Sequence, residues 1–81
     1  MIKIKIKCYS QVKYALGKDE ISLELEPETT TAELEELVRE QARGQLEGIS
    51  LRTAVNRVYV PEPVVVQDGD EIAFIPPVQG G

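Results

Sequence analysis

The sequence predicts a single α+β domain in which one main helix packs on one face of a mixed β-sheet. Two observations support this prediction. Segments in which apolar and polar residues alternate, as in strands with one buried face, lie near both ends of the sequence, and a segment with helical spacing lies between them. The 81 residues are enough for one modest hydrophobic core and leave no room for a second domain.

The first strand is predicted at residues 2–9, where isoleucines alternate with lysines. The period of two places the isoleucines on the core face and the lysines toward water. Cys8, the only cysteine, falls on the core face, so we interpret it as a buried apolar group and not as a nucleophile. Tyr9 falls on the opposite face, with the lysines.

Two short elements are predicted next. Residues 11–16 fit a helical turn that Gly17 stops. Residues 21–26 alternate again between apolar and polar side chains, which predicts a second strand that Pro27 ends.

The main helix has the clearest local pattern. Thr30 and Glu33 fit a capping box, with Thr31 as the competing N-cap, and Gly44 or Gly48 is expected to end the helix. The predicted core face consists of Leu34, Leu37, Val38 and Gln41–Ala42, and the predicted solvent face of Glu35, Glu36, Arg39 and Glu40. Glu35 and Arg39 have the spacing of an i, i+4 ion pair.

The second half of the sequence predicts further strands. One strand is expected near residues 52–60, followed by a short apolar stretch at residues 64–66 and a turn at Asp68–Gly69. The last strand, at residues 71–75, leads directly into a double proline. This order of strand, strand, helix and closing strands is that of the β-grasp arrangement, in which the first and last strands lie parallel in the middle of the sheet.

We therefore assign residues 1–75 to a β-grasp domain and residues 76–81 to an extended C-terminal tail. The tail consists of Pro76, Pro77, Val78, Gln79, Gly80 and Gly81. The prolines favour an extended backbone, and the glycines remove side chains from the last two positions. Six extended residues span roughly 20 Å, which is long enough to carry the carboxylate of Gly81 into a pocket of another protein.

Composition excludes several classes of function. The sequence has no histidine and a single cysteine, so histidine-based triads are absent, no internal disulfide can form and no metal site is predicted. A net charge of -5 disfavours binding to nucleic acid. No apolar run approaches the length of a membrane helix, and the charged start does not fit a signal peptide, so we expect a cytoplasmic protein without membrane contact.

A resemblance to a known family follows from the C-terminal motif. Residues 68–81 read Asp-Gly-Asp, then a strand that ends Ile-Pro-Pro-x-x-Gly-Gly, and this resembles the MoaD-type ubiquitin-like sulfur carriers, the small subunits of molybdopterin synthase. Ala54-Val55-Asn56 and the segment at residues 11–17 are also similar to that family. The resemblance therefore spans nearly the whole chain.

The resemblance implies a chemistry for Gly81. In the family, a ubiquitin-activating-like adenylyltransferase uses ATP and magnesium to adenylate the terminal glycine, and a persulfide sulfur donor converts the adenylate to a thiocarboxylate. The large subunit, with which the small subunit forms a heterotetramer, then takes up the tail, and the sulfur is transferred to a cyclic pyranopterin monophosphate to form the dithiolene of molybdopterin. The resemblance thus implies a sulfur-donating subunit with no permanently bound cofactor, whose catalytic groups lie on its partner.

A partner surface is predicted beside the tail. If Phe74 points into the core, Ile75 points to the other face, and parallel pairing of the first and last strands places Tyr9 at the same end. We predict an apolar patch there, with Tyr59 as a third candidate residue.

Two alternative functions remain open on the sequence. A thiazole-pathway sulfur carrier and a ubiquitin-like protein modifier share the fold, the diglycine end and the adenylation step. Conjugates to lysines of other proteins would distinguish the modifier, and a stable complex with a large subunit would distinguish the synthase subunit.

Overall fold

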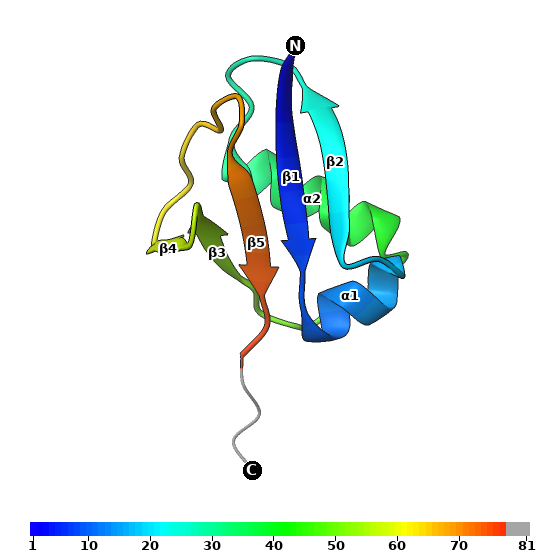
Figure 1. The fold of residues 1–81 in the computed structure, drawn as a ribbon. Coiled ribbons are helices and arrows are strands. Elements are labelled where there is room, and N and C mark those ends of the chain that lie inside the picture. The colour runs from blue at the N-terminus through cyan, green and yellow to red at the C-terminus, as the bar shows by residue number, and fades with distance from the viewer. Residues whose placement is uncertain (78–81) are drawn as a thin grey trace.

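The computed structural model of the protein describes residues 1–77, which form one mixed five-stranded sheet and two helices. The strands are β1 (Ile2–Cys8), β2 (Glu20–Leu25), β3 (Arg52–Val55), β4 (Val58–Val60) and β5 (Glu71–Ile75), and the helices are α1 (Ser10–Leu16) and α2 (Thr31–Gln41). The strand order is β2-β1-β5-β3-β4, with β1 and β5 parallel at the centre (Figure 1). This topology confirms the predicted β-grasp fold.

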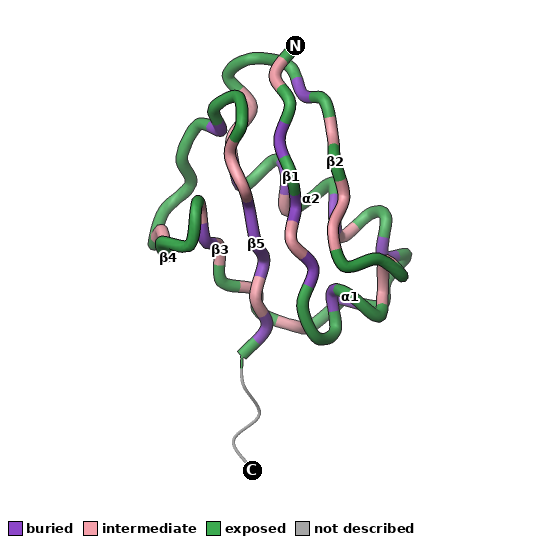
Figure 2. The backbone as a smooth tube through the Cα atoms, viewed as in Figure 1, coloured by how far each residue is buried: buried purple, intermediate pink, exposed green. Residues whose placement is uncertain are grey.

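Both helices lie on one face of the sheet, as the ribbon shows (Figure 1). The hydrophobic core fills the space between the helices and that face. Buried positions of β1 alternate with more exposed ones, whereas Ile72, Ala73 and Phe74 of β5 are buried in succession (Figure 2). The core consists of Ile4, Ile6, Cys8, Val12, Leu25, Leu34, Val38, Ala42, Leu46, Val66, Ile72 and Phe74. Within residues 1–77, no helix covers the other face, which we call the open face. It carries Lys3, Lys5, Lys7, Arg52, Ala54, Tyr59, Ala73 and Ile75.

The core-facing side chains of the two central strands are those predicted, although Ala73 on the opposite face of β5 is buried as well. In β1, Ile4 and Ile6 are buried while Lys3 and Lys5 are exposed, and in β5 the side chain of Phe74 has no exposed surface. Because a fully buried phenylalanine removes a large apolar area from water, Phe74 contributes strongly to the stability of this core.

Helix α2 begins as predicted and ends earlier than predicted. The hydroxyl of Thr30 accepts a hydrogen bond from the N–H of Glu33, whose carboxylate accepts one from the N–H of Thr30, so the capping box is complete. The prediction that Gly44 or Gly48 ends the helix is wrong: the helix ends at Gln41 with Ala42 as C-cap, and turns continue to residue 48.

The helix cannot continue past Arg43 and Gly44, because both have a positive φ, of 51° and 86°, and the turns that follow are held by Arg39. Its guanidinium donates to the backbone carbonyls of Leu46 and Ile49, both at 2.7 Å, and to the carboxylate of Glu35 at 2.9 Å. The predicted pair with Glu35 is therefore present, but Arg39 is half-buried and not part of a solvent face. Leu37, assigned to the core face, keeps 36% of its surface exposed, so the apolar stripe of α2 is narrower than predicted.

The single strand predicted near residues 52–60 is two strands. Asn56 and Arg57 form the turn between β3 and β4, and both have a positive φ, of 50° and 71°. Two consecutive positive φ angles are typical of the type I′ hairpin turn, whose usual second residue is glycine. The presence of arginine at that position explains why the sequence pattern did not indicate a turn.

The loop before β5 is held against β1 by one backbone bond and one side-chain bond. Gly69, with a φ of 86°, allows the predicted turn at Asp68–Gly69, and its N–H donates to the carbonyl of Lys3 at 2.7 Å. A carboxylate oxygen of Asp68 accepts from the N–H of Lys3, also at 2.7 Å. These bonds fix the start of β5 against the start of β1.

The apolar stretch at residues 64–66 is not a strand. Val65 makes one isolated bridge to Thr30, and only Val66 is buried.

Candidate functional site: the tail root and the open face

The final strand carries the chain from the core to the surface within a few residues. Phe74 is fully buried, Ile75 is half-buried, Pro76 is buried and Pro77 is exposed. We call residues 75–77 the tail root. Gly81, the predicted reacting residue, and Val78, Gln79 and Gly80, the predicted tail, lie outside the described residues.

Strand pairing arranges the open face in rows across the sheet. One row runs from Tyr59 on β4 through Ala54 on β3 and Ala73 on β5 to Lys7 on β1. Ala54 and Ala73 are only 5% and 8% exposed, although no helix covers them. Because their side chains are single methyl groups, their larger neighbours can lie close against the sheet above them.

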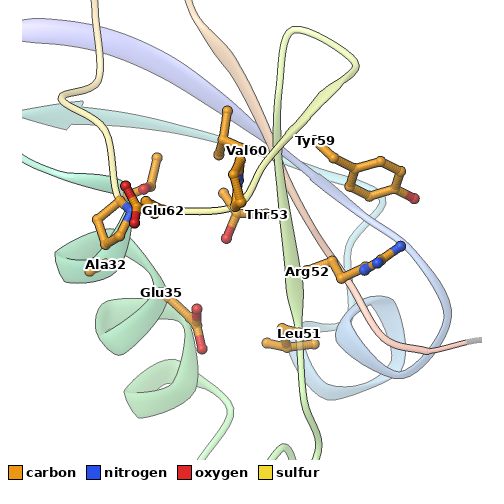
Figure 3. A pocket seen from close by; sticks show the side chains of 11 residues that line it. Ala32, Glu35, Leu51, Arg52, Thr53, Tyr59, Val60 and Glu62 are labelled. Carbon is orange, nitrogen blue, oxygen red and sulfur yellow. The ribbon is translucent and has the colours of Figure 1, made fainter.

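The next row of the open face lies at the tail root. Arg52 is opposite Ile75 in the β3–β5 pairing. The Arg52 guanidinium carbon lies 5.3 Å from the centre of the Tyr59 ring, within the range of a cation–π interaction. Figure 3 shows Arg52 and Tyr59 together on one side of β3.

The three predicted interface residues are only partly brought together. Tyr9 follows β1 directly and keeps an extended backbone, so it continues the alternation of β1 beside Ile75, and it is 48% exposed. Tyr59 is 54% exposed but lies two strands away from Ile75, because β3 separates β4 from β5. Arg52 connects the two, since it is paired with Ile75 and stacked on Tyr59.

Sequence reasoning missed Arg52. No periodic pattern marks it, because its place depends on the hairpin between β3 and β4 that the sequence did not reveal. A turn signal at Asn56, the one residue type there that tolerates a positive φ well, could have shown that residues 52 and 59 are near neighbours.

Two of the three lysines of the open face, Lys5 and Lys7, are paired with an acidic side chain. Glu20 on β2 accepts from the Lys7 ammonium at 2.9 Å and lies 3.8 Å from that of Lys5. The hydrogen bond and attraction between Lys7 and Glu20 raise the pKa of Lys7 and lower the pKa of Glu20. Lys13 and Asp19 lie 2.8 Å apart, and their hydrogen bond and attraction raise the pKa of Lys13 and lower the pKa of Asp19.

Cys8 is buried, as predicted, with 4% of its surface exposed. Burial, with a smaller effect of the Asp19 charge, raises the pKa of the thiol above its ordinary value. A buried thiol that resists ionisation is a poor nucleophile, which agrees with the interpretation of Cys8 as a core residue.

A groove of about 490 Å³ lies at the free edge of the sheet, between β3, β4 and the first turns of α2 (Figure 3). Its walls include Ala32, Leu51, Val60 and Pro61, and the carboxylate of Glu35 points toward it. Since Glu35 already accepts from Arg39, this groove holds no unpaired acid–base group from α2.

Residues 1–77 lack both a cluster of metal ligands and a membrane-spanning helix. No group of three or more histidine, cysteine or acidic side chains in that part of the chain is placed to hold a metal ion. None of its helices has both the length and the apolar character needed to cross a membrane.

Comparison with known proteins identifies the family. The model of the ThiS family matches residues 6–81, which is nearly the whole sequence. The chain belongs to the ThiS family. It is 35% identical to the molybdopterin synthase sulfur carrier subunit of Haemophilus influenzae over 80 residues, which cover 96% of this chain and 99% of the relative. The resemblance to MoaD-type carriers is thereby confirmed.

Solved structures of similar fold extend this comparison. A Pyrococcus furiosus protein described as molybdopterin converting factor subunit 1 is 25% identical, with a TM-score of 0.84 over 96% of this chain and all of the other. Small archaeal modifier protein 1 of Haloferax volcanii has a TM-score of 0.78 at 18% identity, over 98% and 99% of the two chains. A chain of the complex of subunits 1 and 2 of Helicobacter pylori molybdopterin-converting factor has a TM-score of 0.69 at 20% identity, over 99% and 100%. At these last two identities the likeness shows the fold alone.

Proposed function

We propose that this ThiS-family chain is the sulfur carrier subunit of a molybdopterin synthase and that Gly81 carries the sulfur. One observation carries the proposal: β5 passes from the fully buried Phe74 to the exposed Pro77 in three residues, so a diglycine end is attached to a rigid body by a very short root. The close relation to the Haemophilus influenzae sulfur carrier subunit over nearly the whole chain supports it.

The proposed chemistry follows from the nature of a carboxylate. A carboxylate resists nucleophilic attack because it is negatively charged and lacks a good leaving group. An activating enzyme therefore transfers AMP from ATP, with magnesium, to the carboxylate of Gly81 and releases pyrophosphate. A persulfide of a donor protein then displaces AMP, and a thiol reductively cleaves the resulting acyl disulfide, which leaves a thiocarboxylate on Gly81.

The glycines and prolines of the tail suit this sequence of steps. A residue without Cβ can pass through a narrow channel and adopt backbone angles closed to other residues. The fixed φ of proline lowers the entropy that is lost when the tail is ordered in a partner. These are properties of the sequence, and they favour a tail that is repeatedly bound and released.

A large subunit is the proposed final partner. The Haemophilus influenzae relative, 35% identical over 80 residues, is named a subunit of molybdopterin synthase, which supports a complex with a large subunit for the present chain, with a heterotetramer as the expected assembly. There the thiocarboxylate transfers its sulfur to the cyclic pyranopterin monophosphate, and two loaded carriers supply the two sulfurs of the dithiolene.

Intact mass spectrometry tests the role of Gly81. Incubation with the activating enzyme of the same organism, ATP, magnesium, a persulfide donor and a reducing thiol is expected to replace one oxygen of the chain by sulfur. A variant without Gly81 is the matched control, because it keeps residues 1–77 and is expected to remain folded and gain no sulfur. Equal sulfur loading of both chains would show that another residue carries the sulfur.

The same samples separate the alternative functions. Covalent ladders on lysines of other proteins, in the absence of a stable complex with the large subunit, would indicate a protein modifier. A loaded chain that supports thiazole formation and fails with the large subunit would indicate a thiazole-pathway carrier.

A further inference from the structure

Arg52 differs from most other cations of the structure in having no carboxylate partner. Lys7, Lys13 and Arg39 each have a carboxylate oxygen within 2.9 Å. Among residues 1–77, no carboxylate lies within 4 Å of the Arg52 guanidinium. Its positive charge is therefore uncompensated by this part of the chain, although the chain as a whole carries a net charge of -5.

The position of Arg52 is nevertheless well defined. Its guanidinium lies 5.3 Å from the centre of the Tyr59 ring, and its backbone is paired with that of Ile75 (Figure 3). The nearly inaccessible Ala54 and Ala73 provide a floor of methyl groups beside this pair. Stacking restricts the rotamers of the arginine and leaves its N–H donors directed along the plane of the guanidinium, so little further entropy is lost when a ligand binds.

The short tail determines which protein comes closest to Arg52. Four residues follow Pro77, and four extended residues reach at most about 14 Å. A protein that takes Gly81 into its active site must therefore contact the body of this chain around the tail root. Ile75 belongs to that root and is directly opposite Arg52, so the same protein covers Arg52.

We propose that Arg52, held against Tyr59, binds a carboxylate of the synthase large subunit and is a specificity-determining residue of that interface. The planar guanidinium can donate two parallel hydrogen bonds to one carboxylate, which a lysine cannot do. This inference rests on the proposed function, because the occupant of the surface is the protein that receives the tail.

The other role open to Arg52 is purely structural. Stacking on Tyr59 connects β3 to β4 and could serve only to stabilise the hairpin. The two roles differ in their dependence on charge and salt: a role in the hairpin changes thermal stability, whereas an intermolecular ion pair changes affinity and its response to ionic strength.

Calorimetric titration with the large subunit of the same organism tests the proposal. Arg52→Gln is expected to weaken binding by about 30-fold or more, as for loss of one partner of a buried charged pair, and Arg52→Glu by more still. Arg57→Gln is the matched control. Arg57 lies on the same hairpin, its side chain is 88% exposed, and it is only loosely paired with Glu71 at 3.9 Å. The affinity of Arg57→Gln for the large subunit is therefore expected to stay within about threefold of the wild-type affinity.

The salt dependence provides the second measurement. The wild-type affinity is expected to fall as ionic strength rises, and Arg52→Gln to show a shallower fall, with circular dichroism confirming that each variant is folded at the temperature of titration. Equal affinity of Arg52→Gln and the wild type, an equal loss in Arg57→Gln, or an unchanged salt response would overturn the proposal. If the wild type itself does not bind the large subunit, the proposed function fails instead, so the two failures are distinguishable.

Discussion

At the scale of single residues, Phe74 and Ile75 show how one strand separates folding from partner binding. They are adjacent, yet Phe74 lies in the core beneath the sheet and Ile75 lies half-buried on the open face. Both faces were predicted from alternation alone, because the period of a strand is fixed by its backbone and does not depend on distant contacts. The sequence did not show that Ile75 lies beside Arg52 on the open face, because this contact depends on the pairing of β5 with β3.

Substitution of these two residues is expected to have opposite effects. Phe74→Ala leaves a cavity in the core and should lower the free energy of unfolding by about 3–5 kcal/mol. Ile75→Lys should lower the free energy of unfolding by less than about 1 kcal/mol. It should nevertheless weaken binding to the large subunit, because it brings a charge into an apolar contact beside Arg52. Thermal melts together with calorimetric titration of both variants measure the two effects. An unfolded Ile75→Lys and a stable Phe74→Ala would mean that the faces of β5 are assigned the wrong way round.

At the scale of elements, sequence patterns predicted the segments whose cause is local. The capping box at Thr30, the stop at Gly17 and the strands β1, β2 and β5 depend on residues within one or two turns of each other. The two wrong predictions have causes that are not local. The turns that follow helix α2 are held by Arg39 through carbonyls seven and ten residues away. The β3–β4 hairpin is held by side-chain bonds between Asn56 and residues 70–71, where β5 begins.

The turn of that hairpin is expected to respond differently at its two positions. Arg57 has a φ of 71°, which strains its backbone and which glycine adopts without strain. Glycine also has greater freedom in the unfolded chain, which offsets part of this gain. Arg57→Gly should therefore raise the free energy of unfolding by about 0.5 kcal/mol. Asn56 donates to the carboxylate of Asp70 at 3.0 Å and accepts from the N–H of Glu71 at 2.9 Å. Asn56→Gly removes both bonds and should lower the free energy of unfolding by about 1–2 kcal/mol.

Urea unfolding of the two variants measures this difference. Both substitutions introduce glycine into the same turn, so each serves as the control for the other. Destabilisation by both to the same extent would mean that the side-chain bonds of Asn56 contribute little and that the turn is not strained at Arg57.

At the scale of the whole molecule, charge is distributed by surface. Acidic side chains dominate the exposed side of α2. On the open face, Lys5 and Lys7 are paired with Glu20, whereas Lys3 and Arg52 have no ion pair within residues 1–77. The separation of basic and acidic segments was visible in the sequence. The sequence did not show which of these cations have an acidic partner. Glu20 reaches Lys7 only through the register of β1 and β2, and the position of Arg52 depends on the pairing of β3 with β5.

The paired carboxylates predict how the stability of the whole domain depends on pH. Glu20 and Asp19 have their pKa values lowered in the folded protein by Lys7 and Lys13. A group whose pKa is lower in the folded than in the unfolded state stabilises the fold above its unfolded pKa, and that stabilisation is lost as the pH falls through the folded pKa. The free energy of unfolding should therefore decrease as the pH falls below the ordinary carboxyl value of 4.5 for Glu20.

Glu20→Gln removes the carboxylate that is paired with both Lys5 and Lys7, so its stability in acid is compared with that of the wild type. At neutral pH the variant should be less stable than the wild type, because Lys7 and Lys5 lose their partner. In strong acid, where Glu20 is protonated in both states, the two proteins should converge, so the variant has the shallower acid profile. Urea unfolding across the acid range measures both profiles, with Glu62→Gln as control because Glu62 is exposed and has no ion pair within residues 1–77. Parallel acid profiles for Glu20→Gln and the wild type would mean that this ion pair adds nothing to the stability of the folded state.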